Sequence, residues 1–207
     1  MCIFAAMKNT LILLVLTLCT LQMHAQDTEL LNLIREEGKN VSTIEADLHH
    51  VKVKDGKTTT QDGTLHYVAP NDMAAIFTTG QYLLANEKKI KVDIGMFHGT
   101  FRLHDGGIPQ ALTNVFLYAF QGRFEELGTE NNFNLSVTPG EDFHTLTFTA
   151  KKKPFLGIGY KTAVFKVNAK DLRVKEIKTT DFNDTEETYS LHNEKYNVEV
   201  DMERFQF

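Results

Sequence analysis

The chain has 207 residues, is 42% hydrophobic and carries a formal net charge of −5. Proteins that bind nucleic acid usually present a basic surface, so this acidic balance argues against a nucleic-acid partner. The length suits one domain with a single core of ordinary size.

The N-terminus has the three-part layout of a secretory signal peptide. Lys8 precedes an apolar run from Leu11 to Leu18, and Ala25 provides a small residue at the exit. This run is shorter than the roughly 20 residues that a helix needs to cross a bilayer, so we expect cleavage. The sequence therefore predicts a signal peptide over residues 1–25 and one mature domain over residues 26–207.

Both cysteines, Cys2 and Cys19, lie in this leader. Its removal would leave a chain without cysteine, which excludes a disulfide framework. A lipid-attachment cysteine normally follows a small residue, whereas Leu18 precedes Cys19. We therefore expect an exported, soluble protein.

The mature chain begins with an amphipathic helix from Asp27 to Gly38. Asp27 is of a type that caps helices, and Gly38 is placed to end this one. Apolar and polar residues then alternate from Ser42 to Val53, which predicts a strand with one buried face. Asp55-Gly56 is a typical two-residue turn into a returning strand.

The first half continues as an antiparallel meander of about five strands in all. The apolar residues of its later strands are Leu65, Tyr67 and Ala69; Met73, Ala75 and Phe77; Tyr82 to Ala85; and Ile90, Val92 and Ile94. A looser, glycine-containing segment from Met96 to Gly107 follows, with Phe97 and Phe101 in it.

A central apolar helix is expected from Pro109 to Leu127, where Pro109 suits a first turn and Gly122 could end a last one. Its apolar residues recur at i, i+3, i+4, i+7 and i+8 and so share one face. These residues are Leu112, Val115, Phe116, Ala119 and Phe120. Such a broad apolar face needs an apolar partner, and the strands around it supply a sheet.

Strand patterns resume after this helix and run to the end of the chain. They carry Phe133, Leu135 and Val137; Leu146 and Phe148; Ala163, Phe165 and Val167; Val174 and Ile177; Tyr189 and Leu191; and finally Val198, Val200, Phe205 and Phe207. We predict an α+β fold in which a single curved antiparallel sheet, an unclosed half-barrel, holds two or three helices in its concave face.

The chain shows no pattern typical of catalysis or metal binding. His49 and His50 are adjacent and face opposite ways on a strand, and His98 and His104 lack a carboxylate at helical spacing. No G-x-S-x-G motif is present, and Gly157-Ile158-Gly159 lacks the third glycine of a dinucleotide loop. Glu186-Glu187 is interpreted as solvated charge. We expect no metal, no cofactor and no enzymatic activity.

The unusual feature is apolar: the chain has fifteen phenylalanines and no tryptophan. These side chains either fill an ordinary core or leave part of the concave face open as a cavity. Two good helices are too few to cover a sheet of this length, which favours a cavity. Its predicted lining is Leu65, Tyr67, Phe77, Met96, Phe97, Phe101, Leu112, Val115, Phe116, Ala119 and Phe120.

The order of elements resembles the LolA-type outer-membrane lipoprotein carriers. The resemblance lies in a leader, an amphipathic helix and a first strand, then in the run from Gly63 to Tyr67 that leads to Pro70. It continues in the segment from Gly122 to Leu127 at the end of the central helix and in the closing residues Phe205-Gln206-Phe207.

This resemblance implies a monomeric periplasmic carrier that holds lipoprotein acyl chains in the apolar cavity and shuttles them from the inner to the outer membrane. Its partners would be acylated lipoproteins, an inner-membrane lipoprotein-releasing transporter and an outer-membrane acceptor. The carriers often have an arginine that ties sheet to lid where Ala74 stands here. The alternative is a periplasmic regulatory module that senses lipid or lipoprotein on the same fold.

Overall fold

The computed structural model describes residues 27–94, 97–102, 108–130, 132–153 and 159–207. The predicted leader, Met96, His104 and the Gly157-Ile158 part of the glycine motif lie outside these residues. The strands are β1 (Thr43–Lys54), β2 (Lys57–Val68), β3 (Asp72–Phe77), β4 (Tyr82–Ala85), β5 (Lys89–Ile94), β6 (Phe97–Arg102), β7 (Phe133–Thr138), β8 (Phe143–Ala150), β9 (Tyr160–Asn168), β10 (Val174–Asp181) and β11 (Glu186–Tyr196).

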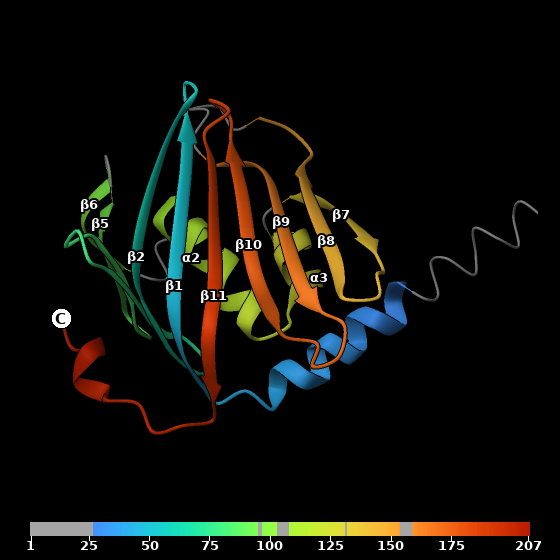
Figure 1. Ribbon diagram of the computed structural model, residues 1–207, viewed down its shortest axis with the longest axis horizontal. Helices are drawn as coiled ribbons and strands as arrows, with labels where there is room; N and C mark the ends of the chain where they lie inside the picture. Colours follow the sequence, from blue (N-terminus) through green and yellow to red (C-terminus); the bar gives the residue numbers. More distant parts are fainter. Residues whose placement is uncertain (1–26, 95–96, 103–107, 131, 154–158) are drawn as a thin grey trace, which may run out of the picture.

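All eleven strands belong to one antiparallel sheet in the order β6-β5-β4-β3-β2-β1-β11-β10-β9-β8-β7. The first and last strands of the meander thus pair in the middle of the sheet (Figure 1). In the described part of the chain, β6 and β7 form two edges that do not pair with each other. The prediction of a curved, unclosed antiparallel sheet is confirmed.

The hairpin between β1 and β2 has the predicted turn. Asp55 and Gly56 both have positive φ, 50° and 71°, and Lys54 pairs with Lys57 across them. Two successive positive φ angles are typical of the tight turns that match the twist of paired strands. This turn sets the register in which every second residue of β1 faces the concave side.

The helices are an N-terminal helix over residues 27–39, α2 (Ile108–Phe120) and α3 (Phe124–Glu130). The helices α2 and α3 lie against the concave face, and the N-terminal helix runs across the lower end of the sheet (Figure 1). The single helix expected from Pro109 to Leu127 is therefore divided in two. The division falls at Gly122, whose φ of 67° is incompatible with a continuing right-handed helix.

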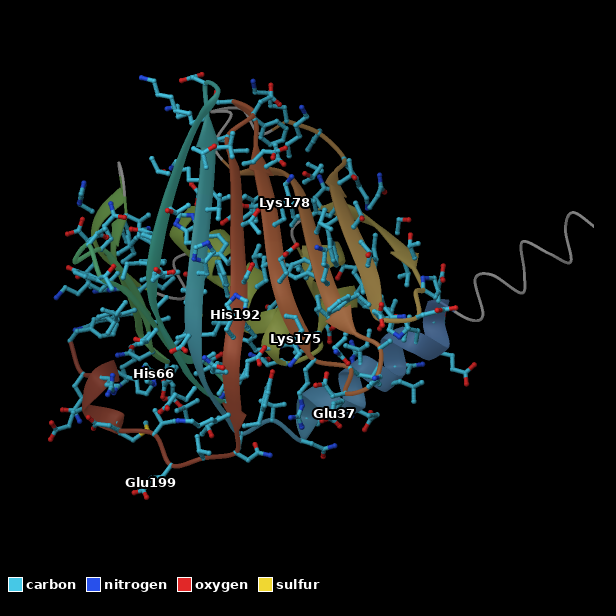
Figure 2. All side chains as sticks on the ribbon, viewed as in Figure 1. Glu37, His66, Lys175, Lys178, His192 and Glu199 are labelled. Atoms are coloured by element: carbon cyan, nitrogen blue, oxygen red, sulfur yellow. The ribbon has the colours of Figure 1, made fainter. Side chains whose placement is uncertain are left out.

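Two further expectations need correction. The looser segment before α2 contains a sixth strand of the first half, β6, which pairs with β5 along its whole length. The chain ends in a short 3-10 helix, η1 (Met202–Phe205), which packs against β3. In Figure 2, His66 of β2 lies beside this C-terminal helix, on the outer face of the sheet.

One half of the concave face is filled by aromatic side chains. The ring centroids of Phe124 on α3 and Phe165 on β9 are 5.1 Å apart, and Phe148 on β8 is 5.4 Å from Phe165. Phe133 of β7 contacts Phe148 edge-on at 6.2 Å. These side chains are buried, so the sheet from β7 to β9 and α3 form an ordinary core.

Candidate ligand-binding cavity

The other half of the concave face is hollow. A cavity of about 290 Å³ lies between α2 and the strands β1 to β5 and β9 to β11. Ligand pockets in proteins usually measure about 300–1,000 Å³, so this one is at the lower end of that range. Its lining residues are Leu48, Lys52, Lys54, Leu65, Met73, Ala75, Phe77, Leu83, Ile90, Val92, Ile94, Phe116, Phe120, Gly159, Tyr160, Ile177, Thr179, Asp181, Asn183, Thr185, Glu187, Tyr189 and Leu191.

Strand alternation accounts for the apolar part of this wall. Met73, Ala75 and Phe77 occupy every second position of β3, and Ile90 and Val92 do the same on β5. Successive side chains of a strand point to opposite faces, so each of these strands presents only apolar groups to the cavity. The wall formed by β3 and β5 therefore suits a hydrocarbon ligand.

The helix α2 closes the cavity with two phenylalanines one turn apart. The Phe116 ring meets the Tyr189 ring of β11 edge-on at a centroid distance of 5.1 Å. The Phe120 ring lies 5.4 Å from the Tyr67 ring of β2. These contacts join α2 to β11 and to β2. Both phenylalanines still face the cavity.

The residues expected to line a cavity are distributed unevenly. Leu65, Phe77, Phe116 and Phe120 lie on its wall. Tyr67, Val115 and Ala119 are buried but are not part of this wall, and Ala119 instead lines a small crevice beside the N-terminal helix.

The other four expected residues give less information. Phe101 is 37% exposed on the edge strand β6 and is not part of the wall. For Phe97 and Leu112 the backbone is described but the side chains are not. Met96 lies outside the described residues.

Sequence reasoning missed the polar end of the cavity. Glu187, interpreted from the sequence as solvated charge, faces the cavity with its side chain only 20% exposed. Lys52 and Lys54 continue the alternation that begins at Leu48, so the pattern of β1 already placed them on the concave face.

Glu187 is held by groups from two strands. Its Oε1 accepts from Lys52 Nζ at 2.8 Å, and its Oε2 accepts from the Tyr189 hydroxyl at 2.5 Å. Burial by itself raises the pKa of Glu187, but the contacts with His50, Lys52 and Tyr189 outweigh burial and lower this pKa to about 2. Glu187 is therefore an ionised carboxylate at neutral pH.

A series of hydrogen bonds orients the His50 ring next to Glu187. Thr79 Oγ1 donates to Gln61 Oε1 at 2.8 Å, which leaves the Gln61 amide nitrogen to donate to His50 Nδ1 at 2.9 Å. A neutral imidazole that accepts at Nδ1 carries its proton on Nε2. That nitrogen lies 3.4 Å from Glu187 Oε2, and the His50 ring stacks on Tyr189 at 4.4 Å.

The outer face of the sheet is of a different kind. Figure 2 shows Lys175, Lys178 and His192 on the outer side of β10 and β11. Ala74 also faces outward, because Met73 and Ala75 on either side of it line the cavity. A side chain at position 74 therefore points away from α2, and an arginine there could not join the sheet to this helix.

The described residues contain no group of three or more His, Cys, Asp or Glu residues that could hold a metal ion. None of the helices in these same ranges is long and apolar enough to cross a membrane.

No protein-family model and no curated protein matches this chain. Similar solved structures include a LolA superfamily protein from Nitrosomonas europaea, with 9% identity, a TM-score of 0.42, and 85% of this chain and 97% of that one covered. LprF from Mycobacterium bovis has 10% identity and a TM-score of 0.44 over 86% and 96%. The MucA/MucB complex of Pseudomonas aeruginosa has 7% identity and a TM-score of 0.43 over 86% and 60%.

Proposed function

We propose that this protein is an exported carrier that binds lipoprotein acyl chains in its cavity and shuttles them from the inner to the outer membrane. The observation that carries the proposal is the hollow half of the concave face, with a wall of apolar side chains on β3 and β5 and two phenylalanines on α2. Apolar cavities of this kind bind ligands chiefly by removing hydrocarbon from water.

The energy available from such burial is sufficient for a carrier. Each buried CH2 group contributes about 0.8 kcal/mol, so a long acyl chain gains roughly 10 kcal/mol before the costs of ordering are subtracted. No specific polar contact is needed to reach useful affinity. A carrier must also release its load, and a cavity at the small end of the usual range favours incomplete burial.

The remaining parts of the proposal follow from the same role. The protein would act in the periplasm after removal of residues 1–25, as a monomer of residues 26–207. It would receive acylated lipoproteins from an inner-membrane releasing transporter and pass them to an outer-membrane acceptor. Neither nucleic acid nor a cofactor takes part.

Binding is tested with purified mature protein and a fluorescent fatty acid. We expect saturable uptake of the probe at micromolar concentration and its displacement by a triacylated lipopeptide. Absence of uptake would contradict the proposal. Shuttling is tested separately, by recovering the protein from the periplasm and identifying bound lipoprotein by mass spectrometry, because a regulatory module that only senses lipid would also pass the binding test.

A further inference from the structure

The cavity changes from apolar to polar along its three central strands. On β1 the lining residues pass from Leu48 to Lys52 and Lys54, toward the hairpin with β2. On β10 and β11, which follow β1 in the sheet, the polar lining residues gather toward the turn that joins these two strands. These residues are Thr179, Asp181, Asn183, Thr185 and Glu187.

The two carboxylates at this polar end already accept hydrogen bonds from the protein. Glu187 accepts from Lys52 and from Tyr189, one with each carboxylate oxygen. Asp181 Oδ1 accepts from the backbone N–H groups of Asn183 and Thr185, both at 2.8 Å. The carboxylates therefore serve mainly to hold the local structure.

Donors, in contrast, remain available. An ammonium group has three N–H donors, and Glu187 takes one from Lys52. The side chain of Lys54 forms no hydrogen bond or ion pair with any residue that the structure describes, so its ammonium group engages no acceptor among those residues. Lys52 and Lys54 are two residues apart on one strand face, which separates their backbones by about 7 Å. An oxygen-bearing group of modest size could contact both.

We infer that the ligand's polar head lies at Lys52 and Lys54, and that the head carries acceptor oxygens next to the acyl chain, as a carboxylate or an ester carbonyl does. The chain then extends toward Phe116 and Phe120. This inference rests on the proposed function and adds the orientation of the ligand and the chemical class of its head. An alkyl chain with a cationic head would meet two ammonium groups instead.

A purely hydrocarbon cargo would give no reason for charges in this wall. Placing an ion pair beside an apolar cavity removes its two charges from water, which costs free energy. The attraction between the charges offsets this cost only when their geometry is good. The pair of Lys52 and Glu187 has side chains only 35% and 20% exposed. A ligand whose head binds to these charges would account for the position of the ion pair.

The test uses four ligands with the same chain and different heads. Purified mature protein is loaded with the neutral probe N-phenyl-1-naphthylamine, and the probe is displaced by myristate, myristyl alcohol or myristyltrimethylammonium. We expect myristate to bind most tightly and the quaternary ammonium most weakly. Myristic acid methyl ester, which keeps the carbonyl without the charge, should fall between myristate and the alcohol.

Two variants examine the polar end directly. Lys54→Gln should weaken myristate roughly fivefold, the effect of losing one partly exposed charge pair, and should leave the alcohol unchanged. Glu187→Gln removes the negative charge beside Lys52 and weakens the contact with its ammonium group, so it should strengthen myristate relative to the alcohol. Lys88→Gln, in the turn between β4 and β5 and away from the cavity wall, is the matched control and should change neither.

The outcomes separate this inference from the proposed function. Equal affinity for myristate and the quaternary ammonium, or equal weakening of every ligand by Lys54→Gln, would overturn the assignment of the head while leaving a chain-binding cavity in place. If the protein binds neither the neutral probe nor any one of the four ligands, the proposed function itself is contradicted.

Discussion

Gly38 and Gly122 meet backbone to backbone where the N-terminal helix crosses the junction of α2 and α3. A methyl group added at Gly38 would lie 2.7 Å from the backbone nitrogen of Gly122 and would overlap the carbonyl of Gln121. A methyl group at Gly122 would overlap the carbonyl of Ile34. The close approach of these segments therefore depends on glycine at both positions.

This contact predicts that alanine at either position is destabilising. Gly38→Ala should lower the free energy of unfolding by about 1–3 kcal/mol, because the extra methyl forces packed backbone apart. Gly122→Ala should cost more, since its φ of 67° adds strain to the same overlap. Urea denaturation of the variants measures both effects.

Gly80→Ala is the matched control for the strain. Gly80 has a φ of 86°, but a methyl group there meets no atom within 4 Å. Its loss of stability should be smaller than that of Gly122→Ala. Equal losses at the two positions would mean that the crossing contributes nothing beyond backbone strain.

The division of the concave face into a filled and a hollow half predicts different effects for similar phenylalanines. Phe124 lies in the aromatic cluster and is 1% exposed, so Phe124→Ala should cost about 3–5 kcal/mol and leave probe binding unchanged. Phe116 borders an existing void, so Phe116→Ala should cost less and should weaken binding of a fluorescent fatty acid markedly. Phe120→Ala should behave like Phe116→Ala.

Both quantities are measured on the same purified variants, by urea denaturation and by probe titration. A large loss of stability in Phe116→Ala with unchanged probe binding would show that α2 is ordinary core. The ligand site would then lie elsewhere in the molecule.

The fold could be predicted because its signals are local. Alternation at Ile44, Ala46 and Leu48 marks the buried face of β1, and Asp55-Gly56 marks its turn. Gly122 is recognisable as a possible helix end, but the sequence predicts one helix through to Leu127 because the apolar pattern continues past this glycine. There the crossing with the N-terminal helix determines the backbone conformation, and that contact is distant in sequence.

The polar end of the cavity could be predicted only in part. Lys52 continues a visible alternation, but Glu187 is opposite it only because β1 and β11 pair in the register that aligns these two residues. Such pairing joins the two halves of the chain and leaves no local signal. Ala74 is a contrary case, because alternation alone would have placed it on the outer face, between Met73 and Ala75.

The lowered pKa of Glu187 predicts an acid-dependent loss of stability. The pKa falls from 4.5 to about 2 on folding, so the folded state holds fewer protons than the unfolded state between these values. The stabilisation, roughly 2–4 kcal/mol, is complete above the higher pKa and is lost as the pH falls through the lower one. Stability of the wild type and of Glu187→Gln, measured by urea denaturation from neutral pH downward, should converge in this range.

Asp184→Asn serves as the comparison for Glu187→Gln. Asp184 pairs with Lys161 at 2.7 Å in an exposed turn, where such a contact contributes little to stability. This variant should keep nearly the wild-type dependence on pH. If Glu187→Gln also keeps the wild-type dependence of stability on pH, the contacts of the Glu187 carboxylate do not stabilise its ionised form.

The C-terminal 3-10 helix is joined to the outer face of the sheet through His66. Arg204 donates to His66 Nε2 at 3.2 Å, which requires a neutral ring with its proton on Nδ1. Glu45 is 4.0 Å from Nδ1. Burial, then the charge of Arg204, lowers the pKa of His66 below 6.5, while Glu45 and Asp201 oppose this shift.

Protonation of His66 would remove the acceptor for Arg204 and place two positive charges together. Because its pKa is lower in the folded state, the unfolded state takes up the proton first, and stability should fall as the pH drops below about 6.5. His66→Gln should reduce this fall, whereas His192→Gln, on the exposed outer face of β11, should not. Hydrogen-exchange protection factors at Met202–Phe205, which correct for the intrinsic pH dependence of exchange, give a local readout and should fall on acidification in the wild type and in His192→Gln but not in His66→Gln. The same fall in all three proteins would show that a different group controls the attachment of this helix.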